Sequence, residues 1–147
     1  MTIFCLNLAS TWFMVGIIWL IQLVHYPLFN FVGSEEFRVF HENHKILITP
    51  VVSIVMIVEL LTSVIILFKP PGGIRNWSLT FGIILLGIIW FSTAYFQIPF
   101  HNTLSLKFNE NALMMLINTN WIRTICWSLR GVLVLIMLNK LLKNKNS

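Results

Sequence analysis

The residues of this chain most able to do chemistry are its four histidines, His25, His41, His44 and His101. A neutral imidazole binds transition metals and accepts a proton near neutral pH. His41 and His44 are three residues apart, so they share one face of a helix and can bind one metal ion. We expect His25 and His101 to join them from neighbouring segments in an iron or copper site. Alternatively, His25 and His101 form an axial pair for a haem b group.

No sequence motif decides between these metal sites and a site without a cofactor. The chain has no C-x-x-C-H motif, no H-E-x-x-H motif and no cysteine cluster. A histidine base and a side chain that holds an oxyanion are sufficient to remove a proton from an apolar substrate. The candidates for this catalytic group are His25, Gln97, His101, Asn120 and Arg123. The alternative without catalysis is a set of hydrogen-bonded histidines at a membrane interface, with Tyr26, Tyr95 and the tryptophans as an aromatic belt.

Two charged residues, Glu59 and Arg130, fall well inside long apolar segments. At a rise of about 1.5 Å per residue, both lie near the middle of a membrane. An unpaired charge at that depth is costly, so we expect a buried Glu59–Arg130 ion pair. The pair either fixes the register of two helices or takes part in a route for a proton or small solute.

The elements that must position these side chains follow from composition. The chain is 57% apolar and only 10% charged, whereas a soluble domain is about 25% charged. Composition therefore excludes a soluble domain, a disordered chain and a nucleic-acid-binding protein. We predict an all-α protein with one membrane domain, residues 1–147, in contact with the lipid bilayer. Its four transmembrane helices are expected to form a bundle at about residues 8–29, 47–68, 77–98 and 121–138.

The connections between the spans predict an orientation. The loop 69–76 and the tail 139–147 are basic and contain no acidic residue. By the positive-inside rule, we expect both termini in the cytoplasm of a cell (inner) membrane protein. All four histidines, together with Gln97, Asn120 and Arg123, then fall toward the extracytoplasmic side.

Both extracytoplasmic connections have helical spacing. Phe37, His41, His44 and Ile48 fall on one face of a short amphipathic helix between the first two spans. Thr49 and Pro50 are expected to be the N-cap and first residue of a separate second span. The connection 100–120 is expected to lie against the membrane surface.

Three short stretches carry a resemblance to a known group: 25–29 (HYPLF), 98–104 (IPFHNTL) and 118–124 (NTNWIRT). They resemble small four-span membrane proteins that are grouped with anthrone-oxygenase-like domains of unknown function. The resemblance implies oxidation of polycyclic anthrones by oxygen without a bound metal. Pro99-x-x-Asn102 and Asn120-x-x-Arg123-Thr124 are the motifs carried over. The sequence departs from the group in His41, in His44 and in the Glu59–Arg130 pair.

Together these observations favour an oxidoreductase that acts on a hydrophobic small molecule at the extracytoplasmic side, with or without haem, iron or copper. The alternatives are a small transporter, which would require a homo-oligomer, and an accessory subunit of a membrane complex. Either alternative would use the Glu59–Arg130 pair.

Overall fold

The computed structural model describes residues 1–72 and 74–145, with the side chain of Lys145 left out. Gly73, in the expected basic loop, and residues 146–147, at the end of the expected basic tail, lie outside the described residues. The described chain forms helices and connecting turns without a strand. The elements are α1 (Thr2–Leu20), η1 (Ile21–His25), α2 (Tyr26–Leu28), η2 (Phe29–Phe31), α3 (Phe37–Phe68), α4 (Asn76–Ser92), η3 (Thr93–Gln97), α5 (Ile98–Leu106) and α6 (Glu110–Lys145).

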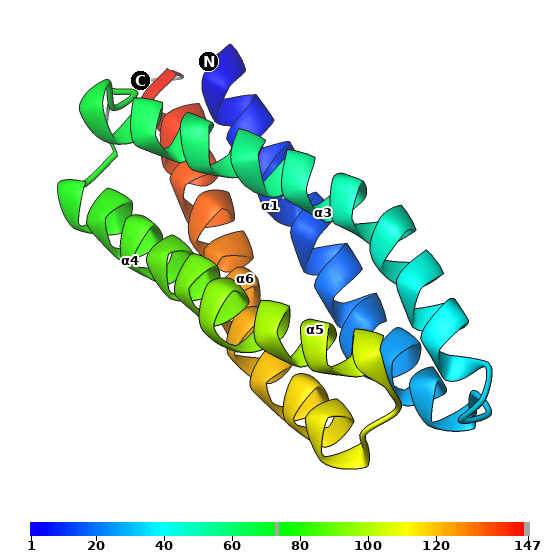
Figure 1. Cartoon of the computed structure of the whole chain (residues 1–147). Helices are drawn as coiled ribbons and strands as arrows, with labels where there is room; N and C mark the ends of the chain where they lie inside the picture. The colour runs from blue at the N-terminus through cyan, green and yellow to red at the C-terminus, as the bar shows by residue number, and fades with distance from the viewer. Residues whose placement is uncertain (73, 146–147) are drawn as a thin grey trace.

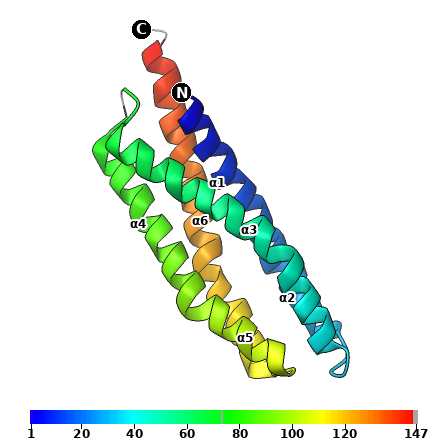
Figure 2. The same cartoon turned by 45° about the horizontal axis from the view of Figure 1, so that its top comes forward.

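These elements form four antiparallel columns, which confirms the predicted all-α four-helix bundle (Figure 1). The first column runs from α1 to η2 and the third from α4 to α5, while α3 and α6 are the second and fourth. Column one packs against α3 and α6, and α4 packs mainly against α6. Contacts between α3 and α4 are sparser. Both termini lie at one end of the bundle, and the turns after η2 and α5 lie at the other (Figure 2). We call this second end, which has the turns after η2 and α5, the turn end; the connection between α3 and α4 lies at the end with the termini.

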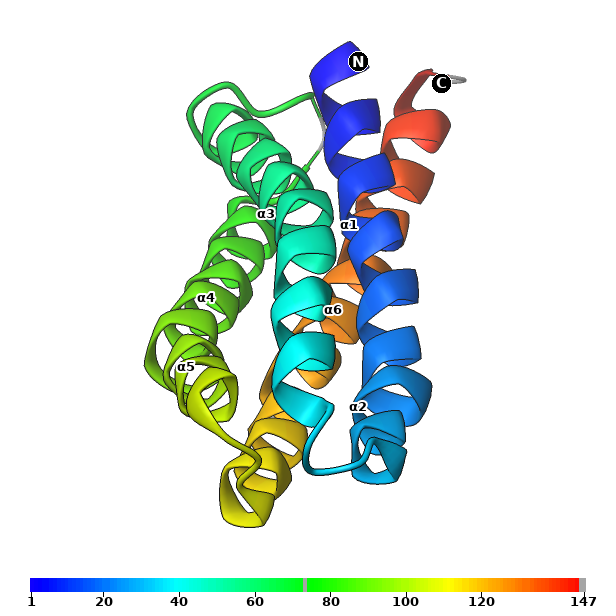
Figure 3. The ribbon, with the colours of Figure 1, turned by 45° about the vertical axis from the view of Figure 1, so that its right-hand side comes forward.

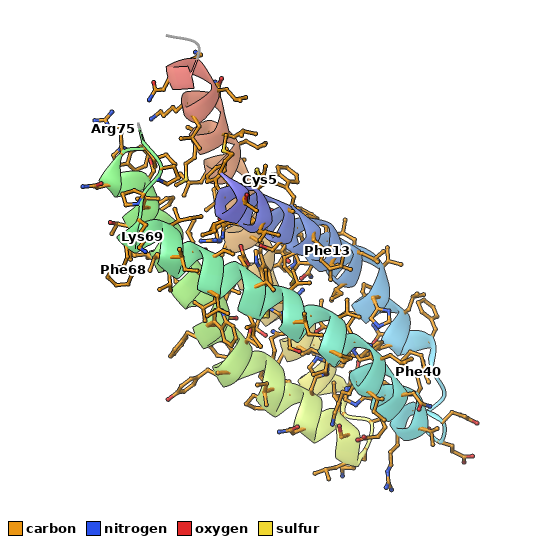
Figure 4. All side chains as sticks on the ribbon, turned by 90° about the horizontal axis from the view of Figure 1, so that it is seen from above. Cys5, Phe13, Phe40, Phe68, Lys69 and Arg75 are labelled. Carbon is orange, nitrogen blue, oxygen red and sulfur yellow. The ribbon has the colours of Figure 1, made fainter. Side chains whose placement is uncertain are left out.

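Each column is long and apolar enough to cross a membrane, so the chain has the features of a polytopic membrane protein. Large apolar side chains cover the outside of the bundle, as Phe13, Phe40 and Phe68 illustrate (Figure 4). In water such a surface would be unfavourable, whereas hydrocarbon chains of a bilayer accommodate it. The four candidate spans are longer than expected from the sequence: Thr2–Phe31, Phe37–Phe68, Asn76–Leu106 and Glu110–Asn144.

The structure corrects the prediction of a separate amphipathic helix before the second span. That segment is helical, but α3 continues through Pro50 without a break. Proline removes one backbone hydrogen bond from a helix interior. The buried face formed by Phe37, His41 and His44 holds the helix against its neighbours on the N-terminal side of that defect. Thr49 therefore does not cap a new helix.

The prediction for the connection 100–120 is also wrong in part. Its first residues belong to α5, and α6 already begins at Glu110. Ala112 and Leu116 are buried in an apolar cluster with Phe29 and Leu104. This segment therefore forms part of the bundle core and does not lie on the membrane surface.

The first and third columns share a local irregularity, a π-helical turn shortly before a proline. The turns η1 and η3 precede Pro27 and Pro99, respectively. A proline lacks the N–H group of a normal helix residue, and its ring crowds the carbonyl four residues earlier. A wider π turn relieves this crowding and changes which residues face inward. The two turns place Gln22 and Gln97 inside the bundle, toward the turn end.

Candidate active site at the turn end of the bundle

The four histidines come together near the turn end, as their positions in the sequence led us to expect. His25 Nε2 lies 2.7 Å from His44 Nδ1, and His41 Nε2 lies 3.0 Å from His101 Nδ1. The two pairs adjoin, because the His44 and His101 ring centroids are 5.7 Å apart. Three columns supply them: the first gives His25, α3 gives His41 and His44, and α5 gives His101.

The arrangement of these rings does not favour the metal sites expected from the sequence. Among the described residues, no three His, Cys, Asp or Glu side chains are placed to hold one metal ion. The histidines are instead paired nitrogen to nitrogen at hydrogen-bonding distance. His25 and His101 also line different cavities, so they do not face each other across a space for haem.

A cavity of about 260 Å³ lies beside the histidines, between α3 and the third column. Figure 3 shows these two columns as neighbours along the perimeter of the bundle. Exposed Thr49 and Ile98 are among the lining residues, so the cavity reaches the lateral surface. Its wall is mainly apolar, with polar groups from all four columns. The polar and aromatic lining residues are Tyr26, His44, Thr49, Ser53, Trp90, Thr93, Gln97, His101 and Arg123.

Three buried side-chain nitrogens of residues that line the cavity have no hydrogen-bond partner in the part of the chain that the structure describes. They are His44 Nε2, Trp90 Nε1 and Arg123 Nε. Arg123 is only 5% exposed, and no carboxylate of the described residues lies within 4 Å of its guanidinium. Its Cζ atom lies 5.3 Å from the centre of the Trp127 ring. Unsatisfied buried polar groups are rare in proteins, so three of them in residues around one cavity indicate a place for a ligand with polar groups.

Tyr26 connects the cavity with the histidines. Its hydroxyl lies 3.1 Å from His101 Nε2 and 3.4 Å from Gln97 Oε1. Gln97 in turn donates to Thr119 Oγ1 at 3.0 Å. Tyr26 is 3% exposed, so the expectation that it belongs to an interfacial aromatic belt is wrong, whereas Tyr95 is exposed on the outside. These hydrogen bonds fix the orientation of the cavity's polar wall.

Two of the expected catalytic residues, Asn120 and His25, lie outside the cavity, and the expected metal ligand His41 does not line it either. Asn120 donates to Gln22 Oε1 at 2.8 Å, and Gln22 donates to the Ile117 carbonyl at 3.2 Å. This contact joins the first column to α6, and neither residue lines the cavity. His25 lines a second cavity of about 300 Å³, which it shares with His44 and exposed Phe40. His44 therefore stands between the two cavities.

The sequence analysis missed Tyr26 and Trp90 as site residues. A signal for Trp90 was present, because Trp90, Thr93 and Gln97 follow helical spacing and extend the polar stripe that ends at His101. Tyr26 carried no such signal, since an aromatic residue near the end of a span is typical of the membrane interface.

Glu59 and Arg130 form the expected buried ion pair, with Arg130 Nε 2.9 Å from Glu59 Oε1. Thr11 donates to Glu59 Oε1 at 2.7 Å, and Trp127 Nε1 donates to Glu59 Oε2 at 2.9 Å. Arg130 also donates to Ser63 Oγ and to the backbone carbonyl of residue 82. The neighbouring cavity has only about 30 Å³. The pair is thus enclosed in a network of hydrogen bonds.

Comparison with known proteins gives no further guide to this site. The chain matches no protein-family model, no curated protein and no solved structure.

Proposed function

We propose that this protein is a membrane-embedded enzyme that binds an apolar molecule with a carbonyl or phenolic oxygen and removes a proton from it. The observation that carries the proposal is the buried, carboxylate-free Arg123 in the wall of an apolar cavity. An oxygen placed at Arg123 Nε and Trp90 Nε1 would satisfy both donors. Negative charge that develops on that oxygen would be stabilised by the guanidinium.

His44 is the candidate general base. His44 lines the cavity, its Nε2 atom has no hydrogen-bond partner, and its Nδ1 atom lies 2.7 Å from His25 Nε2. When His44 Nδ1 carries the hydrogen and donates to His25, Nε2 has a lone pair for the proton of the bound molecule. His25 then acts as a positioning residue that holds the His44 ring and stabilises its protonated form.

Oxidation of the deprotonated molecule is the second part of the proposal. An electron-rich enolate or phenolate reacts with dioxygen, which serves as the electron acceptor. For a methylene group between aromatic rings, R₂CH₂ and O₂ give R₂C=O and H₂O. The resemblance of stretches 98–104 and 118–124 to anthrone-oxygenase-like proteins supports this choice of substrate class. The resulting function is an oxidoreductase for fused-ring ketones, with no step assigned to a metal.

The substrate is expected to come from the bilayer. The cavity reaches the lateral surface between α3 and the third column, where contacts between the columns are sparse. Lys69 and Arg75 lie at the end of the bundle that holds the termini (Figure 4). With the positive-inside rule, this supports cytoplasmic termini in the cell membrane and a site toward the extracytoplasmic side.

Anthrone, a fused-ring ketone with an acidic methylene group, is the probe that tests the proposal. The full chain in lipid nanodiscs is expected to oxidise anthrone with consumption of dioxygen. His44→Gln should lower the rate about 10²–10⁴-fold, the usual contribution of a general base. His25→Gln should lower it less, because His25 acts through His44. Asn76→Gln, at an exposed position at the other end of the bundle, is the control. Oxidation at the wild-type rate by His44→Gln would overturn the assignment of the base.

The Glu59–Arg130 pair gives less support to the transporter or accessory-subunit alternatives. Both charged groups are fully engaged by neighbours, and the adjoining cavity has room for about one water molecule. A route for a solute past Glu59 and Arg130, in one chain or in a homo-oligomer, would require these hydrogen bonds to break. We therefore assign the pair to helix register.

A further inference from the structure

A continuous line of hydrogen-bonding side chains leads from the surface at the turn end to the cavity. Lys45 Nζ donates to Ser105 Oγ at 2.7 Å, and Ser105 Oγ lies 3.3 Å from His41 Nδ1. His41 Nε2 lies 3.0 Å from His101 Nδ1, and His101 Nε2 lies 3.1 Å from the Tyr26 hydroxyl. Tyr26 is part of the cavity wall. Both imidazoles therefore use one nitrogen toward the surface and the other toward the cavity.

The outer end of this line and its middle differ in exposure. The Lys45 side chain is 30% exposed and lies 3.5 Å from Glu42 Oε1, whose side chain is 44% exposed. His41, by contrast, is fully buried and stacks between the rings of Phe37 and His101, at centroid distances of 5.7 and 5.2 Å. The aromatic packing holds the ring in place and keeps bulk water away from it. The His41 imidazole is therefore the hydrogen-bonding link between Ser105 and His101.

We propose that Lys45, Ser105, His41 and His101 form a proton relay that supplies Tyr26 from the extracytoplasmic surface. The proposal depends on the proposed function for its acceptor, the oxygen of a molecule bound in the cavity. Tyr26 is then the proton donor at the site, in contrast to the base His44. The His25–His44 pair is not hydrogen-bonded to this relay in the described structure.

Each transfer in the relay breaks one bond to hydrogen and forms another. The Tyr26 O–H bond breaks as an O–H bond forms on the bound molecule, and the phenolate oxygen takes the Nε2 proton of His101. His101 Nδ1 takes the Nε2 proton of His41, and His41 Nδ1 takes the hydroxyl proton of Ser105. Ser105 is reprotonated by the Lys45 ammonium, which recovers its proton from water. The Ser105 hydroxyl, which donates to the His101 carbonyl at 2.9 Å, must rotate for this step.

Exchange of the His41 ring hydrogen with solvent deuterium tests the relay without any ligand. The full chain, labelled with ¹⁵N-histidine in nanodiscs, is transferred to D₂O, and exchange is followed by NMR. Ser105→Ala removes the hydroxyl that links His41 to Lys45, so we expect exchange at His41 to slow by about tenfold or more, as for loss of one hydrogen bond. Exchange at His25 and His44 should not change.

Two further variants separate a relay from a packing effect. Ser105→Thr keeps the hydroxyl and should restore the wild-type rate at His41. Ser128→Ala removes another serine that hydrogen-bonds to the carbonyl four residues earlier and should have no effect. An unchanged rate at His41 in Ser105→Ala, or a faster rate at all four histidines, would overturn the relay. Anthrone oxidation does not enter this measurement, so the relay and the proposed function can fail separately.

Discussion

Arg123 and Arg130 are two buried arginines on the same helix, two turns apart, in opposite situations. Arg130 is 3% exposed and donates to a carboxylate, a hydroxyl and a backbone carbonyl. Arg123 is 5% exposed, keeps one nitrogen without a partner and faces a cavity of about 260 Å³. Burial of a charge is costly in either place. Arg130 has a carboxylate partner and further hydrogen-bond acceptors, whereas Arg123 has only the neighbouring Tyr26 hydroxyl and Trp127 ring and keeps its Nε atom without a partner.

The hydrogen-bond partners of a buried polar group indicate its role better than its residue type or its depth in the membrane does. Both arginines are charges within spans, and Trp127 lies beside Arg123 and donates to Glu59, the partner of Arg130. They differ in their partners, because Arg130 is paired with a carboxylate and Arg123 keeps its Nε atom without a partner. Substitutions in the inner network should therefore change stability, and substitutions at the cavity should change binding.

The largest effect is expected when the inner pair is broken. Glu59→Leu leaves the buried Arg130 charge without its carboxylate partner and should lower the free energy of unfolding by about 3–5 kcal/mol. The double variant Glu59→Leu/Arg130→Met removes both charges and should recover most of this loss. SDS titration in bicelles measures the free energy of unfolding of the single and the double variant. Glu110→Leu, at an exposed position, is the control. A double variant as unstable as Glu59→Leu would contradict the comparison.

The next effect concerns the other arginine. Arg123→Met should weaken anthrone binding by about 10–100-fold, since a hydrogen bond to a charged group contributes about 1.5–3 kcal/mol. The free energy of unfolding should stay the same or increase, because the variant no longer buries a charge that has no carboxylate partner. Fluorescence titration and SDS unfolding give the two values, and Arg38→Met, an exposed position, is the control. Unchanged binding would mean that the ligand does not meet Arg123.

A tryptophan can be replaced by phenylalanine both in the ion-pair network, at Trp127, and in the cavity wall, at Trp90. Trp127→Phe removes the donor to Glu59 Oε2 and should lower the free energy of unfolding by about 1–3 kcal/mol, the cost of an unsatisfied buried acceptor. The phenyl ring still lies beneath Arg123, so anthrone binding should change little. Unfolding and binding titrations on the same preparation check this. A loss of binding without a loss of stability would reverse the assignment.

The smallest change in free energy is expected from replacement of the cavity tryptophan, Trp90, by phenylalanine. Trp90→Phe removes a donor that has no partner in the free protein, so stability should not fall. Binding of anthrone should weaken by about fivefold, equivalent to about 1 kcal/mol for one neutral hydrogen bond. A fall in stability larger than the fall in affinity would show that Trp90 is a packing residue.

The spans and the Glu59–Arg130 pair could be predicted because each depends on a local property. Apolar length defines a span, and two opposite charges at equal depth have few other partners. The continuous α3 helix could not be predicted, because Pro50 argues locally for a break and only the burial of His41 and His44 opposes it.

The candidate site was predictable only in part. The shared location of the histidines followed from helix direction. The i, i+3 spacing of His41 and His44 suggested a shared metal ion, but each ring pairs with a histidine of another column. That pairing depends on helix packing between distant segments, and so do the free donors of Trp90 and Arg123.

The opening of the cavity between α3 and the third column has a consequence for how affinity must be expressed. A molecule that arrives sideways equilibrates with the membrane phase, and its concentration in water matters only through its partition coefficient. Compounds with the same polar group but longer alkyl substituents would then have lower apparent dissociation constants when these are expressed as concentrations in water. Expressed as mole fraction in lipid, their half-saturation points should coincide.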